Sequence, residues 1–84
     1  MNRAEILEKL KEIASLTVQD SAALAKMDDE NADLNTDLGL SSVGILYIAI
    51  AIEEMFRIRM DDVSFGDFKT VRDVADYIEK KLGA

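Results

Sequence analysis

The residues best suited to chemistry in this chain are two adjacent serines, Ser41 and Ser42, which follow a turn-forming stretch at residues 37–40 (DLGL). A long apolar run begins directly after them. If that run is a helix, the serines stand at its start, where free N–H groups and the positive end of the helix dipole favour a phosphate. A serine hydroxyl there can carry a phosphodiester. The plainer interpretation is that both serines cap the helix, and physics alone favours it because serine caps are common.

The stretch from Ser42 to Phe56 is predicted to be one amphipathic helix. Its apolar residues recur three and four positions apart, in one stripe formed by Ile45, Ile48, Ala49, Ile52 and Phe56. Isoleucine and alanine also alternate here, which would suit a strand, but the pattern continues helically beyond Ile52 and the run is too long for a typical strand. The apolar run at residues 43–52 is too short to cross a bilayer.

Two more long helices are predicted, at residues 3–16 and 71–82. Each carries an apolar stripe on one side. Thr70 is a suitable cap for the start of the second of them, and Gly83 is a suitable terminator. Because every long helix is apolar on one side, the helices must pack against one another.

A short helix is predicted at residues 61–65, capped by Asp61 or Asp62 and broken by Gly66 and Asp67. The expected fold class is therefore all-α, a small up-down bundle of three long helices and one short helix, in a single domain spanning residues 1–84. The expected core combines one face of each long helix with apolar residues of the connections: Ile6, Leu10, Ile13, Leu38, Ile48, Ile52, Phe56, Met60, Phe68, Val71, Val74 and Ile78.

The long connection between the first two long helices contains a predicted short helical turn capped by Asp20. Residues 27–36 (MDDENADLNT) are polar and acidic, and we expect them to be exposed. A calcium loop of the EF-hand type starting at Asp29 would need glycine at its sixth position and a carboxylate at its twelfth. Those positions hold Leu34 and Leu40, so this kind of calcium site is excluded.

Composition restricts the classes of function. The chain has 10 basic and 17 acidic residues and a net charge of −7, which argues against binding nucleic acid or an anionic membrane and suits basic protein partners. It has no cysteine and no histidine, so metal sites of the His/Cys type and Ser–His or Cys–His catalysis are excluded within the chain. Residues 1–5 show no apolar signal core, and we expect a monomeric cytoplasmic protein that binds no metal.

Residues 37–43 resemble the attachment site of acyl carrier proteins, in which an acidic residue, Leu, Gly and a variable residue precede Asp-Ser-Leu at the start of the second helix. The matching residues here are Asp37, Leu38, Gly39, Leu40, Ser41, Ser42 and Val43. The resemblance continues through residues 53–56 (EEMF), the turn at 61–62 and residues 70–78 (TVRDVADYI). It is strong over about half of the chain and covers all of it in layout.

The resemblance implies that Ser42 carries 4′-phosphopantetheine, which a phosphopantetheinyl transferase takes from coenzyme A. The thiol of that group would hold acyl intermediates as thioesters. Acyl-loading and acyl-processing enzymes of fatty-acid, polyketide or specialised lipid biosynthesis, with basic and apolar docking surfaces, are the implied partners. The chain itself would catalyse nothing and would hold no catalytic residue.

The chain departs from the family's pattern at four positions. Ser41 replaces the aspartate before the attachment serine, and Val43 replaces the leucine after it. Gly44 and Tyr47 stand where acidic residues are usual on the docking face. We therefore expect a mainly apolar docking face, formed by Val43, Leu46, Tyr47, Ile50, Glu53 and Glu54. The candidates for an acyl-chain cavity are Ile45, Ile48, Ile52, Phe56, Met60 and Tyr77.

Two other functions remain open from the sequence. A related carrier for aminoacyl or peptidyl groups would have the same fold and a different loading enzyme. An unmodified helical adaptor could use the face around Leu46, Tyr47 and Ile50 to bind a protein, since exposed apolar patches usually mark a partner or ligand. Alternatively, the long connection could partly cover Leu46 and Ile50.

Overall fold

The computed structural model describes residues 1–61 and 65–83, without the side chain of Phe65. Its elements are α1 (Arg3–Ala14), α2 (Ser21–Ala25), the 3-10 turn η1 (Lys26–Asp28), α3 (Ser42–Phe56), the 3-10 turn η2 (Phe65–Asp67) and α4 (Val71–Leu82). The described residues form no β-sheet, so the expected all-α class is confirmed. No helix in this part of the chain is long and apolar enough to cross a membrane.

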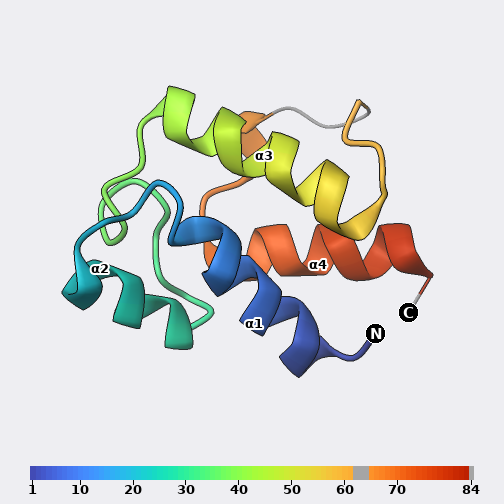
Figure 1. Ribbon diagram of the computed structural model, residues 1–84, viewed down its shortest axis with the longest axis horizontal. Helices are drawn as coiled ribbons and strands as arrows, with labels where there is room; N and C mark the ends of the chain where they lie inside the picture. Colours follow the sequence, from blue (N-terminus) through green and yellow to red (C-terminus); the bar gives the residue numbers. More distant parts are fainter. Residues whose placement is uncertain (62–64, 84) are drawn as a thin grey trace.

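Helix α1 is the element that joins the other two long helices, because it packs against both α3 and α4. In Figure 1, α1 runs from right to left, while α3 and α4 run from left to right. Residues 15–41 therefore join α1 to α3 at one end of the bundle, whereas the chain must return along the bundle between the end of α3 and the start of α4. The first of these connections, which includes α2, lies at the end of the bundle where α3 begins (Figure 1).

The helix ends follow from local capping chemistry. Asn2 caps α1 by accepting a hydrogen bond from the Glu5 N–H at 2.9 Å, and Asp20 caps α2 by accepting one from the Ala22 N–H at 3.0 Å. Thr70 and Asp73 form a reciprocal capping box at the start of α4. The predicted caps Asp20 and Thr70 and the predicted bounds of α3 and α4 are thus confirmed.

The first helix ends two residues earlier than predicted. The N–H groups of Leu16 and Thr17 donate to the carbonyls of Ile13 and Ala14, both at 3.0 Å, which tightens the chain into a turn after Ala14. Leu16 therefore leaves the helix with 72% of its surface exposed. The predicted short helix at residues 61–65 lies largely outside the described residues. Gly66 and Asp67, which were predicted to end it, belong to the 3-10 turn η2.

The predicted core is confirmed except at Ile48, which packs against the core but is only half-buried. The prediction that residues 27–36 are exposed is wrong for Met27, Ala32 and Leu34, which are buried. The backbone of Ala32 and Leu34 pairs with residues around the start of α4: the Leu34 N–H donates to the Lys69 carbonyl at 2.8 Å, and the Val71 N–H donates to the Ala32 carbonyl at 3.1 Å. This pairing seats apolar residues of an otherwise polar segment in the core.

Arg3 ties three parts of the chain together. Its guanidinium donates to Asp76 at 2.8 Å and to Glu79 at 2.7 Å on α4, and it also donates to Glu30 in the long connection. The hydrogen bond with Glu30, assisted by that with Asp76, raises the pKa of Arg3 above its usual value although burial opposes this. The start of α1, the connection and α4 are thus held by one cation.

Phe56 tests the core prediction at the end of α3. Its ring is 6% exposed, so Phe56→Ala should cost about 3–5 kcal/mol of unfolding free energy. Met55, its neighbour, is 41% exposed, so Met55→Ala should cost about 0.5 kcal/mol or less. Chemical denaturation of both variants beside the parent chain measures the difference. Equal losses would show that Phe56 does not contribute as a core residue.

Candidate functional site

The two serines at the start of α3 have different roles. Ser41 is the N-cap residue, with extended backbone angles, and its Oγ accepts a hydrogen bond from the Gly44 N–H at 3.3 Å. Ser42 is the first residue of the helix and is exposed. Within the part of the chain that the structure describes, no group is hydrogen-bonded to the Ser42 hydroxyl. The capping interpretation therefore holds for Ser41 and leaves the Ser42 hydroxyl available.

A hydrogen-bonded loop holds the start of α3 in place. The carboxylate of Asp33 accepts the N–H groups of Asn35 at 2.8 Å and Thr36 at 2.9 Å, and these bonds lower the pKa of Asp33. Asp37 in turn accepts the Asp33 N–H at 2.7 Å. The Asn35 side-chain amide donates to the Leu40 carbonyl at 2.8 Å, directly before Ser41. The segment that leads to the serines is therefore a folded loop and not an open one.

Gly39 allows the last turn of this loop. Its φ is +70°, in the left-handed region that side chains disfavour, and its N–H donates to the Asn35 carbonyl at 2.9 Å. The space around a Cβ at this position is open, so the requirement for glycine is conformational and not steric. The turn directs the chain into the cap at Ser41 and so sets where Ser42 lies.

The start of α3 has the electrostatic character that suits a phosphate group. The first turn has free N–H groups and contains no acidic residue, so the positive end of the helix dipole is not neutralised there. The sequence has no histidine or cysteine that could activate the hydroxyl. Among residues 1–61 and 65–83, no group of three or more acidic side chains is placed to hold a metal ion.

The outward side of α3 is apolar, as the sequence predicts. Tyr47 is 62% exposed, and Leu46 and Ile50 keep 43% and 45% of their surface exposed, so the long connection does not bury them. Val43, at the serine end, is exposed as well. We call Val43, Leu46, Tyr47 and Ile50 the outer face of α3.

The two acidic residues expected in the docking face differ in their surroundings. Glu53 is half-buried, and its carboxylate accepts the Met60 N–H at 2.9 Å, which turns the chain back after α3. Glu54 is exposed to solvent. Glu53 therefore has a structural contact that the sequence did not predict, whereas Glu54 is free to meet a partner's charge.

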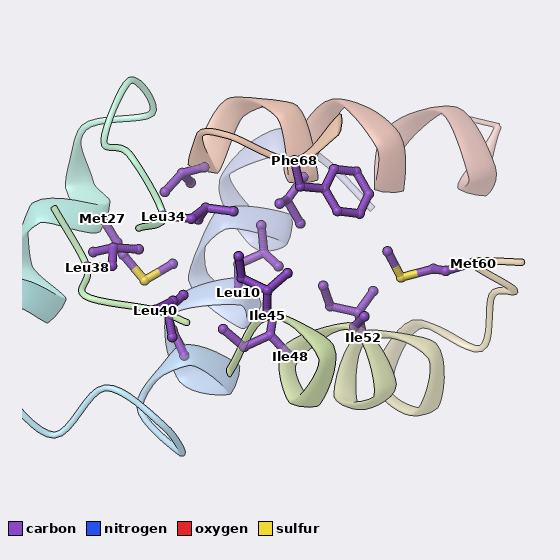
Figure 2. A pocket seen from close by; sticks show the side chains of 14 residues that line it. Leu10, Met27, Leu34, Leu38, Leu40, Ile45, Ile48, Ile52, Met60 and Phe68 are labelled. Atoms are coloured by element: carbon purple, nitrogen blue, oxygen red, sulfur yellow. The ribbon is translucent and has the colours of Figure 1, made fainter. Parts of the chain in front are cut away.

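An apolar cavity of about 30 Å³ lies on the inner side of α3 (Figure 2). Met27, Leu38 and Leu40 lie at one end and Met60 at the other, and Phe68 faces α3 across it (Figure 2). Sequence analysis proposed Ile45, Ile48, Ile52 and Met60 for such a cavity, and all four line it. The lining residues that it missed come mostly from α1, the long connection and the start of α4: Leu10, Ala14, Met27, Leu34, Leu38, Leu40, Ala49, Phe68, Val71 and Val74.

Phe56 and Tyr77, the other two candidates for an acyl-chain cavity, do not line this space. Phe56 packs into the core at the far end of α3. Tyr77 packs edge-to-face against Phe68 with ring centres 5.5 Å apart, and its hydroxyl donates to the Arg59 carbonyl at 3.3 Å. The tyrosine hydroxyl needs a polar partner, so the ring is held behind Phe68 and away from the cavity.

Comparison with known proteins gives a consistent result. Residues 4–78 match a family model described as "Phosphopantetheine attachment site". The acyl carrier protein of Thermotoga maritima is 37% identical, and the alignment covers 98% of each chain. The acyl carrier protein of Coprothermobacter proteolyticus is 34% identical over 98% of this chain and 96% of its own, and that of Thermosynechococcus vestitus is 34% identical over the full length of both.

These matches agree with the geometry of the site. An exposed hydroxyl at a helix start with free N–H groups fits covalently bound 4′-phosphopantetheine, because the group joins a protein through a phosphate. The apolar cavity fits acyl cargo. A phosphopantetheinyl transferase and acyl-processing enzymes are the general partners of such proteins. The chain belongs to the acyl carrier protein family and carries acyl groups on covalently bound 4′-phosphopantetheine.

Proposed function

We propose that the Ser42 hydroxyl is the attachment point, and that residues 1–84 act as one monomeric carrier domain in the cytoplasm that catalyses no reaction itself. The observation that carries the assignment is the division of roles between the two serines. Ser41 Oγ is occupied by the Gly44 N–H, whereas Ser42 Oγ is exposed at the first residue of the helix. A phosphate on Ser42 would also bring negative charge to a helix start that has none.

The residues around Ser42 hold and orient the group. When bound, 4′-phosphopantetheine supplies a thiol that carries acyl groups as thioesters. Ser41 and the loop anchored by Asp33 keep the start of α3 ordered, so the attached phosphate has a defined position. The apolar cavity on the inner side of α3 can shelter an acyl chain from water. Its side chains are all apolar, which favours acyl cargo over the aminoacyl or peptidyl cargo considered from the sequence.

The outer face of α3 is the proposed docking surface for the partner enzymes, together with Glu54. Its apolar residues extend from the serine end to the middle of the helix and are uncharged, so association should depend mainly on desolvation of apolar area. Glu54 and the net charge of −7 complement a basic rim on the partner. We propose specialised partner enzymes whose docking surfaces are apolar at the centre and basic at the edge.

Modification at Ser42 can be tested by intact mass. After incubation with coenzyme A and a broad-specificity phosphopantetheinyl transferase, the parent chain should gain one phosphopantetheine, and peptide mapping should place it on Ser42. Ser42→Ala should gain none. The control is Ser41→Asp, which keeps a good N-cap and should still be modified. Modification of Ser42→Ala, or a modified Ser41 in the parent chain, would contradict the proposal.

Tyr47 tests the apolar docking face. Tyr47→Glu should leave the fold intact because the side chain is 62% exposed. It should weaken turnover by the chain's own partner enzymes, since a central aromatic anchor is replaced by a charge. It should also improve use by enzymes of ordinary fatty-acid synthesis and make that use more sensitive to salt.

Paired kinetic assays at low and high salt measure these effects. The matched control is Met55→Glu, which adds the same charge to the same helix outside the outer face. Equal turnover of Tyr47→Glu and Met55→Glu with both sets of enzymes would show that Tyr47 does not take part in docking. Unfolding of Tyr47→Glu would show that its ring is needed in the core.

A further inference from the structure

Two exposed arginines, Arg57 and Arg59, follow the end of α3. They are the only basic residues between Lys26 and Lys69, in a chain with a net charge of −7. Ile58 between them is half-buried and packs against the core. Two cations are therefore presented to solvent on either side of a residue that is anchored in the fold. We call Arg57 and Arg59 the basic turn.

Arg57 has a backbone conformation that arginine disfavours. Its φ is +56° and its ψ is +48°, in the left-handed region, and no other residue except glycine has a positive φ in the part of the chain that the structure describes. Glycine is the usual residue at such a helix end, because a Cβ costs energy there. The local fold therefore gains nothing from arginine at position 57, and strain of this kind clusters at functional sites.

Contacts with both neighbouring helices hold the backbone of the basic turn. The Glu53 carboxylate on α3 accepts the Met60 N–H at 2.9 Å, and the Tyr77 hydroxyl on α4 donates to the Arg59 carbonyl at 3.3 Å. Met60 itself is buried. A side chain on a backbone fixed in this way loses less conformational freedom on binding than one on a mobile segment. The basic turn is therefore preorganised for contact with a partner.

The two guanidinium groups are available for that contact. Among the residues that the structure describes, the Arg57 side chain has no hydrogen bond and no ion pair. Arg59 Nη2 lies 3.7 Å from Asp61 Oδ2, but the two side chains are 82% and 67% exposed, and so exposed an ion pair is worth little. Both arginines can therefore pair with carboxylates from outside the chain.

The basic turn continues the docking side of α3. Arg57 follows Ile50 by seven residues, which is about two helical turns, and the exposed Glu54 stands between them. Along this side from Ser42, the surface is first apolar, then acidic at Glu54 and finally basic at Arg57. The apolar part alone would let a partner lie along the helix in either direction. An acid followed by a base at one end makes the two directions unequal.

We propose that the basic turn binds carboxylates on the acyl-loading enzyme and so fixes the direction in which that enzyme docks on α3. This inference deepens the proposed docking surface and rests on it. The edge of the enzyme's surface is then basic opposite Glu54 and acidic opposite Arg57. Arginine suits this contact because its planar guanidinium pairs with a carboxylate through two hydrogen bonds. Arg57 lies about 22 Å along the helix axis from Ser42, so the pair aligns the serine end from a distance.

An enzyme fits the basic turn better than a second copy of this chain or a membrane does. Two copies would each bring a net charge of −7, and their repulsion opposes association. The same charge opposes binding to an anionic membrane. An enzyme that places a few carboxylates beside an apolar and a basic area instead meets the charges of α3 in their own order.

The first test measures kcat/KM of the holo chain with the acyl-loading enzyme of the same organism. Arg57→Glu should lower kcat/KM by about tenfold or more, because like charges then face each other. Arg57→Lys should keep most of it, since the positive charge remains. The matched control is Lys80→Glu, which makes the same change of net charge at an exposed residue of α4 and should have little effect. Equal effects of Arg57→Glu and Lys80→Glu would overturn the inference.

Arg57→Gly separates docking from folding. Glycine adopts the left-handed region without a Cβ penalty, so this variant should raise Tm while it lowers kcat/KM. An arginine with a structural role alone would move stability and turnover in the same direction. Unchanged kcat/KM in Arg57→Gly would show that the enzyme does not use the side chain.

Carbodiimide cross-linking identifies the carboxylate that the basic turn meets. The reagent joins an amine to a carboxylate in contact with it, so Arg57→Lys should be linked to an Asp or Glu of the acyl-loading enzyme, which peptide mass spectrometry locates. Changing that acid to lysine should restore turnover of Arg57→Glu. Links to Glu54 or Asp61 of the same chain alone would count against the inference, as would a dimer or binding to anionic vesicles that Arg57→Glu abolishes.

Tyr47→Glu, measured beside these variants, separates this inference from the proposed function on which it rests. If Tyr47→Glu impairs turnover by the acyl-loading enzyme and Arg57→Glu does not, the basic turn alone is contradicted. If neither variant impairs turnover, the docking surface itself is contradicted. Intact mass confirms beforehand that every variant is in the holo form.

Discussion

The packing of one face of α1 against both other long helices is the interaction on which the rest of this structure depends. Ile6, Leu10 and Ile13 are almost completely buried, and α1 contacts α3 and α4. A chain of 84 residues has room for a single core, so none of the three helices could bury its apolar side without the others. Arg3 secures the same arrangement at the start of α1 through its carboxylate partners on α4 and in the connection.

The core also places the functional end of α3. Residues 30–34 pair with the segment before α4, and the loop that follows is bonded to itself through Asp33, Asn35 and Asp37. The start of α3 is therefore anchored from two sides, by its own cap and by a loop attached to another helix. The position of the exposed Ser42 hydroxyl is therefore fixed by the fold and not by the helix alone.

Helix α3 has two apolar sides with different tasks. Ala49, Ile52 and Phe56 are buried and belong to the core. Leu46, Tyr47 and Ile50 are exposed, although the chain is strongly acidic elsewhere. Ser41 shows the same preference at the helix start: its hydroxyl caps the helix as the family's aspartate would, but without a charge. The helix keeps the capping and packing chemistry of an acyl carrier protein and replaces charge with apolar area on its outer side.

The sequence by itself determined the features that depend on neighbours along the chain. The bounds of α3 and α4, the caps at Asp20 and Thr70 and the terminator Gly83 follow from hydrogen bonds and side-chain contacts within four residues, which a sequence pattern records directly. The candidate attachment residue, Ser42, came from the same local pattern together with the resemblance to a family.

Only the tertiary structure decided the features that depend on distant contacts. Ala32 and Leu34 sit in a polar segment, and they are buried because that segment pairs with residues around the start of α4, far along the chain. Tyr77 fits the cavity by helical position, yet its hydroxyl takes it to the Arg59 carbonyl. Ile48 belongs to the buried stripe by periodicity, but in the folded chain it is only half-buried, and it lines a surface groove with Ile13 and Leu16 as well as the cavity.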